Sequence, residues 1–196
     1  MPFRSILDQA HHLLHEAAAA APPDNRWGVD ATVGNGHDTA FLAETLGPNG
    51  HVIGFDVQKA ALEATTRRLA NRQLADRVTL HHVGHEHMAA HLPADAHHAL
   101  CAVAFNLGYL PRHDHAIITR PATTVAALQA AAAHLRIGGR ISVVCYTGHA
   151  GGPDEAAAVQ SWAAALPPDA FEVLDYRFVN QRHAPPRLVV VERISS

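Results

Sequence analysis

Gly34 and Gly36 stand in the segment Asp30-Ala-Thr-Val-Gly-Asn-Gly-His-Asp-Thr39, directly after a short apolar run. Glycine permits a tight turn and a close approach of the backbone to a ligand, and a helix that begins there presents free N–H groups. The strict dinucleotide fingerprint needs a third glycine where Thr39 stands, and the chain has no P-loop pattern. The segment therefore predicts a ligand-binding loop, with an ordinary strand-to-helix turn as the alternative.

Asp56 follows the next strand-like segment, residues 51–55, twenty residues beyond Gly36. A carboxylate at this place can accept hydrogen bonds from both hydroxyls of a ribose. Aspartate is also a common helix N-cap, and for Asp56 alone the two interpretations are equally good. Together with the glycine loop at this separation, Asp56 favours a nucleoside ligand.

His85 and Glu86 follow the third strand-like segment, where polar groups could contact the edge of an adenine. The alternative for Glu86 is an acid in the first turn of a helix. Five histidines lie between residues 81 and 91, which raises the question of zinc. The H-E-x-x-H pattern needs a second histidine where Ala89 stands, so we expect no metal site.

Asn106 follows the continuous apolar run 100–105, and Tyr109 comes three residues later. An asparagine amide can hydrogen-bond an amine, and an aromatic ring can stack on a planar base. A turn asparagine and a packed aromatic are the alternative. The fifth strand-like segment is followed by Tyr146-Thr-Gly-His-Ala-Gly-Gly152, a glycine-rich loop that carries His149 and whose alternative is a flexible connection.

Strand-like and helical segments alternate along the chain, which predicts an α/β fold with a doubly wound, mostly parallel sheet. Strands are expected at 27–31, 51–55, 77–83, 98–105, 140–146, 171–179 and 187–193, and helices at 3–21, 38–46, 59–71, 86–91, 121–135 (ended by Gly138-Gly139) and 153–166. No helix separates the last two strands, so they should form an antiparallel hairpin at one edge. Ligands of such sheets bind beyond the carboxyl ends of the strands, where the residues above lie.

The 196 residues predict a single domain, 1–196, with residues 1–23 as an N-terminal helix that Pro22-Pro23 ends. No run of eighteen apolar residues occurs and the N-terminus does not resemble a secretory signal, so no membrane association is expected. Cys101 and Cys145 lie in apolar segments, which indicates buried thiols and a cytoplasmic location. The net charge of −3 gives no overall basic field.

These motifs resemble the class I S-adenosylmethionine (SAM)-dependent methyltransferases. More narrowly, they resemble the bacterial “putative rRNA methylase” family, now assigned to tRNA 5-(aminomethyl)-2-thiouridine methyltransferase. The resemblance runs from Arg26 to Glu192, and its N-L-G-Y-L-P and Y-x-G-H-x-G-G motifs are specific, whereas the first glycine loop is generic. The matching segments are 30–39, 54–58, 85–86, 105–111, 123–124 and 146–152 with Glu155.

The resemblance implies a Rossmann-like seven-stranded sheet, SAM as methyl donor and the exocyclic amine of 5-aminomethyl-(2-thio)uridine at the tRNA wobble position as acceptor. The cofactor contacts expected are Asp30, Gly34, Asn35, Gly36, Asp38, Thr39, Asp56, Gln58, His85 and Glu86. Asn106, Tyr109 and His149 are the expected catalytic residues: Asn106 would orient the amine and Tyr109 would stack on the base, while His149, Tyr146 or water would take the proton.

The expected partner is the anticodon loop of tRNA. Without a basic stripe, contact with RNA would depend on scattered arginines and on added charge from a homodimer or an extra factor. These arginines are Arg112, Arg120, Arg177, Arg182 and Arg187. The alternative function is a class I methyltransferase that acts on rRNA or on a small-molecule amine.

Overall fold

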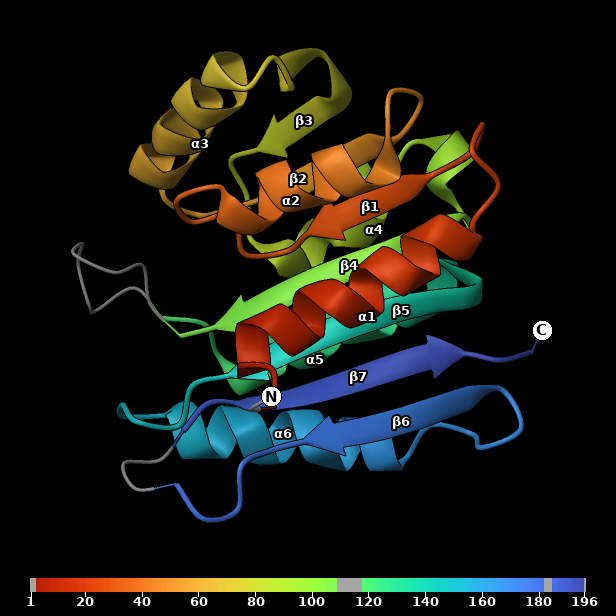
Figure 1. The fold of residues 1–196 in the computed structure, drawn as a ribbon. Coiled ribbons are helices and arrows are strands. Elements are labelled where there is room, and N and C mark those ends of the chain that lie inside the picture. The colour runs from red at the N-terminus through yellow and green to blue at the C-terminus, as the bar shows by residue number, and fades with distance from the viewer. Residues whose placement is uncertain (1–2, 109–117, 182–184, 196) are drawn as a thin grey trace.

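The alternating apolar segments form one sheet in the computed structural model, which describes residues 3–108, 118–181 and 185–195. Within these residues the sheet has seven strands in the order β3-β2-β1-β4-β5-β7-β6 (Figure 1). The strands are β1 (Trp27–Asp30), β2 (His51–Phe55), β3 (Val78–His81), β4 (Leu100–Leu107), β5 (Leu135–Cys145), β6 (Phe171–Tyr176) and β7 (Arg187–Arg193). The strand order reverses between β1 and β4, which is where ligands of doubly wound sheets bind.

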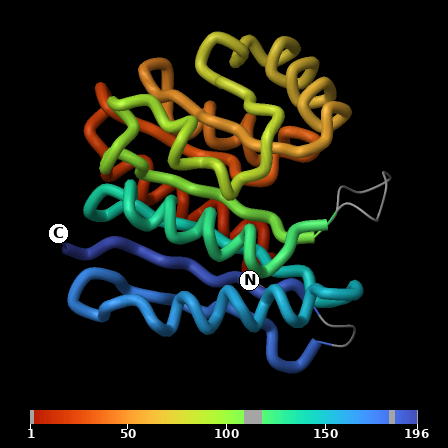
Figure 2. Tube along the Cα trace, turned by 180° about the vertical axis from the view of Figure 1, so that it is seen from behind, coloured from red at the N-terminus to blue at the C-terminus, as the bar shows by residue number. Residues whose placement is uncertain are grey.

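Helices cover both faces of the sheet, as the front and back views show (Figures 1 and 2). One face carries α1 (Ile6–Ala20), α2 (His37–Leu46) and α3 (Lys59–Asn71). The other carries the short α4 (Met88–His91), α5 (Pro121–His134) and α6 (Gly152–Ala164). The predicted α/β fold with a doubly wound sheet is thus confirmed, and the helix near the N-terminus spans Ile6–Ala20.

Strand β4 lies at the centre of the sheet and presents different side chains to its two faces. Phe105 and Leu107 contribute to the large core under α5 and α6, whereas the small Ala102 and Ala104 face α1 and α2. Because protein interiors are close-packed, small residues on the strand let α1 lie close to the sheet. The N-terminal half of α1 thereby comes to the edge where β1 and β4 end (Figure 1).

The predicted antiparallel hairpin at the edge is also confirmed. Strand β7 runs against both of its neighbours, with Ile141 opposite Val191 in β5 and Val173 opposite Val191 in β6. The arrow of β7 accordingly points opposite to the others in Figure 1. The described residues between β6 and β7 include no helix that could make a parallel crossover, and the chain returns antiparallel.

The role expected for Gly138-Gly139 was wrong, because α5 ends at His134 and both glycines lie inside β5. Gly138 has a φ of +76°, and the register of β5 against β4 shifts between Leu100 and Ala102. A Cβ atom at Gly139 would lie 2.5 Å from the carbonyl oxygen of Leu100. The glycines therefore serve a strand irregularity and a close backbone approach rather than a helix end.

Three histidine rings gather where α5 meets the segment before β4. The ring of His134 lies 4.5 Å from that of His97 and 5.4 Å from that of His98 between centroids. Burial, followed by the charges of these two neighbours, lowers the pKa of His134 from its ordinary value of 6.5. Position 134 then binds a proton more readily in the unfolded chain than in the folded one. The free energy of unfolding therefore has its full value above pH 6.5 and decreases as the pH falls through the pKa of His134 in the folded state.

We expect His134→Gln to make the free energy of unfolding less dependent on pH between about pH 7.5 and about pH 5, because the variant lacks this titrating group. Urea titrations followed by circular dichroism across this range provide the measurement. His15→Gln, at an exposed position of α1, is the control and should keep the wild-type dependence. Identical pH profiles for wild type and His134→Gln would contradict the prediction.

Candidate functional site

A cavity of about 530 Å³ lies at the carboxyl edge of the sheet, between the ends of β1, β2 and β4. Its lining brings together eight of the residues predicted from the sequence. These are Gly34, Asn35, Asp38, Asp56, Gln58, His85, Glu86 and Asn106. The volume falls in the range of small-molecule sites, about 300–1,000 Å³.

The loop after β1 turns through two left-handed glycines, Gly34 with φ +52° and Gly36 with φ +73°. A Cβ atom at Gly36 would lie 2.5 Å from Oγ1 of Thr65, so no other residue fits there without displacement. Helix α3 holds the loop from outside. The Thr65 hydroxyl donates to the Gly34 carbonyl at 3.1 Å, and Arg68 Nε donates to the Asn35 carbonyl at 2.7 Å. Thr65 and Arg68 were not among the predicted site residues, although their spacing of three places them on one face of a helix.

Asp30, Gly36 and Thr39 are not among the described cavity-lining residues: Gly36 is part of the loop, and Asp30 and Thr39 lie behind it. Asp30 and Thr39 are fully buried, and the Thr39 hydroxyl donates to Asp30 Oδ2 at 2.6 Å. Burial, and next the charge of Asp38, raises the pKa of Asp30 to about 7. The pair joins the end of β1 to α2, so these residues hold the loop and do not line the cavity.

Asp56 holds the same loop from the end of β2. Its two carboxylate oxygens accept the backbone N–H of Gly34 at 2.9 Å and that of Gln58 at 2.8 Å. Helix α3 begins with Gln58 as its N-cap, so the alternative role of Asp56 as that N-cap is not what the structure shows. Burial raises the pKa of Asp56 despite these two bonds. Each oxygen retains a second lone pair for a ligand hydroxyl.

His85 and Glu86 line the cavity from the short 3-10 turn His85–His87 after β3. His85 is buried, and Nδ1 lies 3.1 Å from the Ala31 carbonyl. A carbonyl only accepts, so Nδ1 carries the proton in this bond. Burial lowers the pKa of His85, which favours a neutral ring whose Nε2 can accept a hydrogen bond. Glu86 is also the acid in the first turn of this 3-10 helix, so that role does not exclude the predicted contact with a ligand, which stays a prediction.

Asn106 reaches the cavity from β4 and is fixed at both its backbone and its side chain. Its N–H donates to the Thr32 hydroxyl at 2.7 Å, which extends the β1–β4 pairing beyond the end of β1. Its side-chain Nδ2 donates to Asp38 Oδ2. The carbonyl oxygen Oδ1 is buried and has no hydrogen-bond partner among the described residues. An unpaired buried acceptor is costly, and a ligand N–H would offset that cost.

Of the two other predicted catalytic residues, Tyr109 and His149, the structure describes only His149. Tyr109 lies outside the described residues. His149 packs against Gly108, with Nε2 3.4 Å from the position of a Cβ there, and it is not among the described cavity-lining residues. Tyr146 does line the cavity, and burial followed by the Asp38 charge raises the pKa of its hydroxyl. The role of His149 stays a prediction.

A buried carboxylate fixes the two ends of the segment that follows β4. Glu155, 2% exposed in α6, accepts the hydroxyls of Thr119 and Thr124, each at 2.6 Å. The Thr119 hydroxyl in turn accepts the N–H of Gly108, and the Thr119 N–H donates to the Gly108 carbonyl. Because Thr119 also lines the cavity, this network positions part of its wall.

Over residues 3–108, 118–181 and 185–195, no group of three histidine, cysteine or acidic side chains is arranged to hold a metal ion. Within the same ranges, no helix has the length and apolar character needed to cross a membrane.

This arrangement of sheet, glycine loop and strand-end acid is that of a class I SAM-dependent methyltransferase. A family model described as “Putative rRNA methylase” matches residues 52–192, and the chain belongs to this family. Two crystal structures are similar over 99% of this chain and 100% of their own. A “putative rRNA-methylase” from Clostridium thermocellum is 41% identical, with a TM-score of 0.91. A “putative methyltransferase” from Streptococcus mutans in complex with SAH is 33% identical, with a TM-score of 0.85.

A relative from a plant is similar over much of the sequence. The chloroplastic tRNA (mnm(5)s(2)U34)-methyltransferase of Arabidopsis thaliana is 35% identical over 173 residues. The match covers 84% of this chain and 62% of that protein, so the present chain spans less than two thirds of its relative's length.

Asp56→Ala is expected to weaken SAM binding at least about tenfold, because it removes a charged acceptor for ribose hydroxyls and releases the Gly34 N–H. Isothermal titration calorimetry with SAM gives the affinity. Asp76→Ala, an exposed acid before β3, should bind as the wild type does. Unchanged affinity in a folded Asp56→Ala variant would exclude Asp56 from cofactor binding.

Proposed function

We propose that this protein is a SAM-dependent tRNA methyltransferase that acts on the exocyclic amine of 5-aminomethyl-(2-thio)uridine at the wobble position. The class follows from the family and the fold. The particular acceptor is supported by the name of the Arabidopsis relative, a tRNA (mnm(5)s(2)U34)-methyltransferase. The site residues are consistent with that acceptor, as the following contacts indicate.

The described residues fit the cofactor. Asp56 offers acceptors for ribose hydroxyls, and the left-handed Gly34 turn lets the backbone approach a ligand. SAM is cationic at its sulfonium, and the described lining of the cavity includes the acidic side chains of Asp38, Asp56 and Glu86. When bound, SAM supplies an activated methyl group on that sulfonium. The protein's own task is then to position the acceptor and to exclude water.

The observation that carries the proposal is the Asn106 side chain. Its Nδ2 is committed to Asp38, so the free hydrogen-bonding atom is the carbonyl oxygen Oδ1. A primary amine needs an acceptor for one of its N–H bonds if its lone pair is to point in a fixed direction. Asn106 provides this acceptor beside the cavity, at the end of the central strand.

Contact with the RNA would involve cationic side chains around the cavity. Arg120 lines the cavity directly, and Arg177 is exposed beyond β6. Arg187 is instead engaged with Asp175, whose Oδ1 accepts from its Nε at 2.7 Å, so it is less available for phosphate than the sequence suggested. Arg112 and Arg182 lie outside the described residues.

The proposal is tested with purified protein, radiolabelled SAM and anticodon stem-loops that carry either 5-aminomethyl-2-thiouridine or unmodified uridine at the wobble position. Methyl incorporation only into the aminomethylated RNA is the expected result. A second assay uses tRNA and rRNA from a deletion strain, in which unmethylated 5-aminomethyl-2-thiouridine should accumulate. Methylation of rRNA but not of the stem-loop would support the alternative rRNA function and overturn the proposal.

We expect Asn106→Ala to lower kcat on the aminomethylated stem-loop by about 10²-fold or more, because a misplacement of about 1 Å in the reacting amine costs that much. Calorimetric SAM affinity should stay near the wild-type value, since Asp56 and the glycine loop remain intact. Asn71→Ala, at the exposed end of α3, is the matched control. Near-normal turnover by Asn106→Ala would show that Asn106 has a structural role and does not orient the acceptor amine.

A further inference from the structure

Among the described residues, the N-terminal helix α1 contributes Leu7 to the cavity lining, although no sequence motif assigned this helix a role in the site. One turn further along the helix, His11 Nε2 lies 2.7 Å from Asp38 Oδ1. The His11 ring also stacks on Phe41 of α2, with a centroid distance of 3.8 Å and an interplanar angle of 5°. Helices α1 and α2 therefore meet through a defined ring orientation beside the site.

The hydrogen-bond directions around Asp38 follow from its chemistry. An ionised carboxylate only accepts, so the nitrogen of each partner must carry a proton. His11 Nε2 therefore donates to Oδ1, while Asn106 Nδ2 donates to Oδ2. The Asn106 amide cannot turn over without placing its carbonyl oxygen against the carboxylate. Asp38 thus determines which way the Asn106 amide points.

The Asp38 carboxylate is shielded from water. Its side chain is 15% exposed and that of His11 is 33% exposed. Shielding makes such contacts stronger than those of surface pairs, which contribute little. His11 occupies the Asp38 oxygen that Asn106 does not use, so it restricts rotation of the carboxylate group.

We propose that His11 is a positioning residue of the methyl-acceptor site, which acts through Asp38 to keep the Asn106 carbonyl available to the acceptor amine. The proposal rests on the proposed function, because it concerns the same amine. It gives α1 a part in catalysis in addition to covering the sheet. A purely structural alternative is that His11 serves only to pack α1 on α2 through the ring of Phe41.

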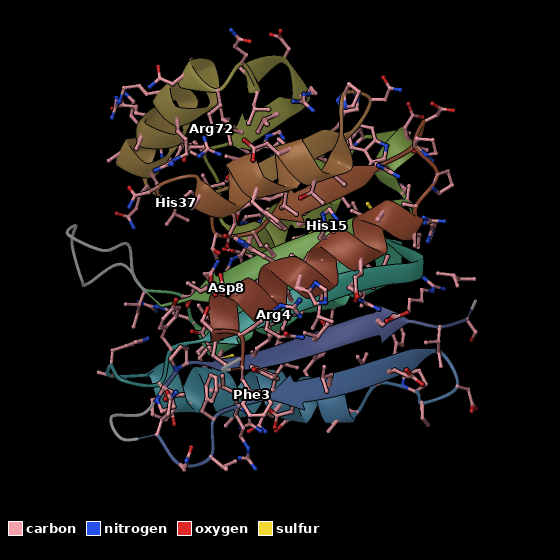
Figure 3. All side chains as sticks on the ribbon, in the orientation of Figure 1. Phe3, Arg4, Asp8, His15, His37 and Arg72 are labelled. Atoms are coloured by element: carbon pink, nitrogen blue, oxygen red, sulfur yellow. The ribbon has the colours of Figure 1, made fainter. Side chains whose placement is uncertain are left out.

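Two substitutions separate these possibilities. His11→Phe keeps an aromatic ring against Phe41 but removes the donor to Asp38. His11→Gln loses the ring but places an amide N–H close to the position of Nε2. A positioning role predicts that Phe impairs the reaction and Gln restores it, whereas a packing role predicts the reverse order. His15→Phe, one turn further along α1 at an exposed position (Figure 3), is the matched control.

The measurements are kcat and KM on the aminomethylated stem-loop, SAM affinity by calorimetry, and the thermal midpoint of each variant. We expect His11→Phe to lower kcat about ten- to a hundredfold, with the KM for RNA and the SAM affinity within about twofold of wild type. His11→Gln should recover most of kcat even if its thermal midpoint falls. His15→Phe should behave as the wild type.

The activities of the wild type and of His11→Phe distinguish a failure of the inference about His11 from a failure of the proposed function. An active wild type with a fully active His11→Phe variant overturns the role of His11 and leaves the proposed function intact. The role of His11 is also overturned if the kcat values of the two variants follow their thermal midpoints, with His11→Gln less active than His11→Phe. A wild type that methylates no aminomethylated stem-loop contradicts the proposed function, and the inference that rests on it is then overturned as well.

Discussion

The turn between β1 and α2 is the constraint on which the site depends. Two left-handed glycines, Gly34 and Gly36, reverse the chain within a few residues, and a side chain at Gly36 would collide with Thr65. The turn brings Thr32 to the backbone of Asn106, and it brings the Gly34 N–H to Asp56. Beyond the turn, Asp38 meets the Asn106 side chain. One short loop therefore connects the ends of three strands.

The electrostatic character of the site follows from what surrounds this turn. Asp30 is buried behind it, while Asp38 and Asp56 line the cavity. Burial raises the pKa of both Asp30 and Asp56, so their ionised forms are costly in this place. A cationic ligand offsets this cost by its charge, and a sulfonium donor is such a ligand.

Much of the fold was predictable because its signals are local. The strand bounds 51–55 and 187–193 and the helix bounds 59–71 agree with the structure at both ends. The error at Gly138-Gly139 has a physical origin: glycine ends helices, but it also permits close backbone contacts inside a strand. Only the neighbouring strand, through the Leu100 carbonyl, decides between these two uses.

The sequence by itself determined which residues follow each strand, and the rule for parallel sheets then placed Asp56, His85 and Asn106 at one edge. It could not separate cavity-lining residues from supporting ones, since Asp30 and Thr39 belong to the same motif as Asp38 yet lie behind the loop. Nor could the sequence connect His11 to Asp38, because no helical or strand periodicity and no motif links positions 27 residues apart. Those contacts arise only when α1 packs across the small residues of β4, which is a property of the packed chain and not of any local segment.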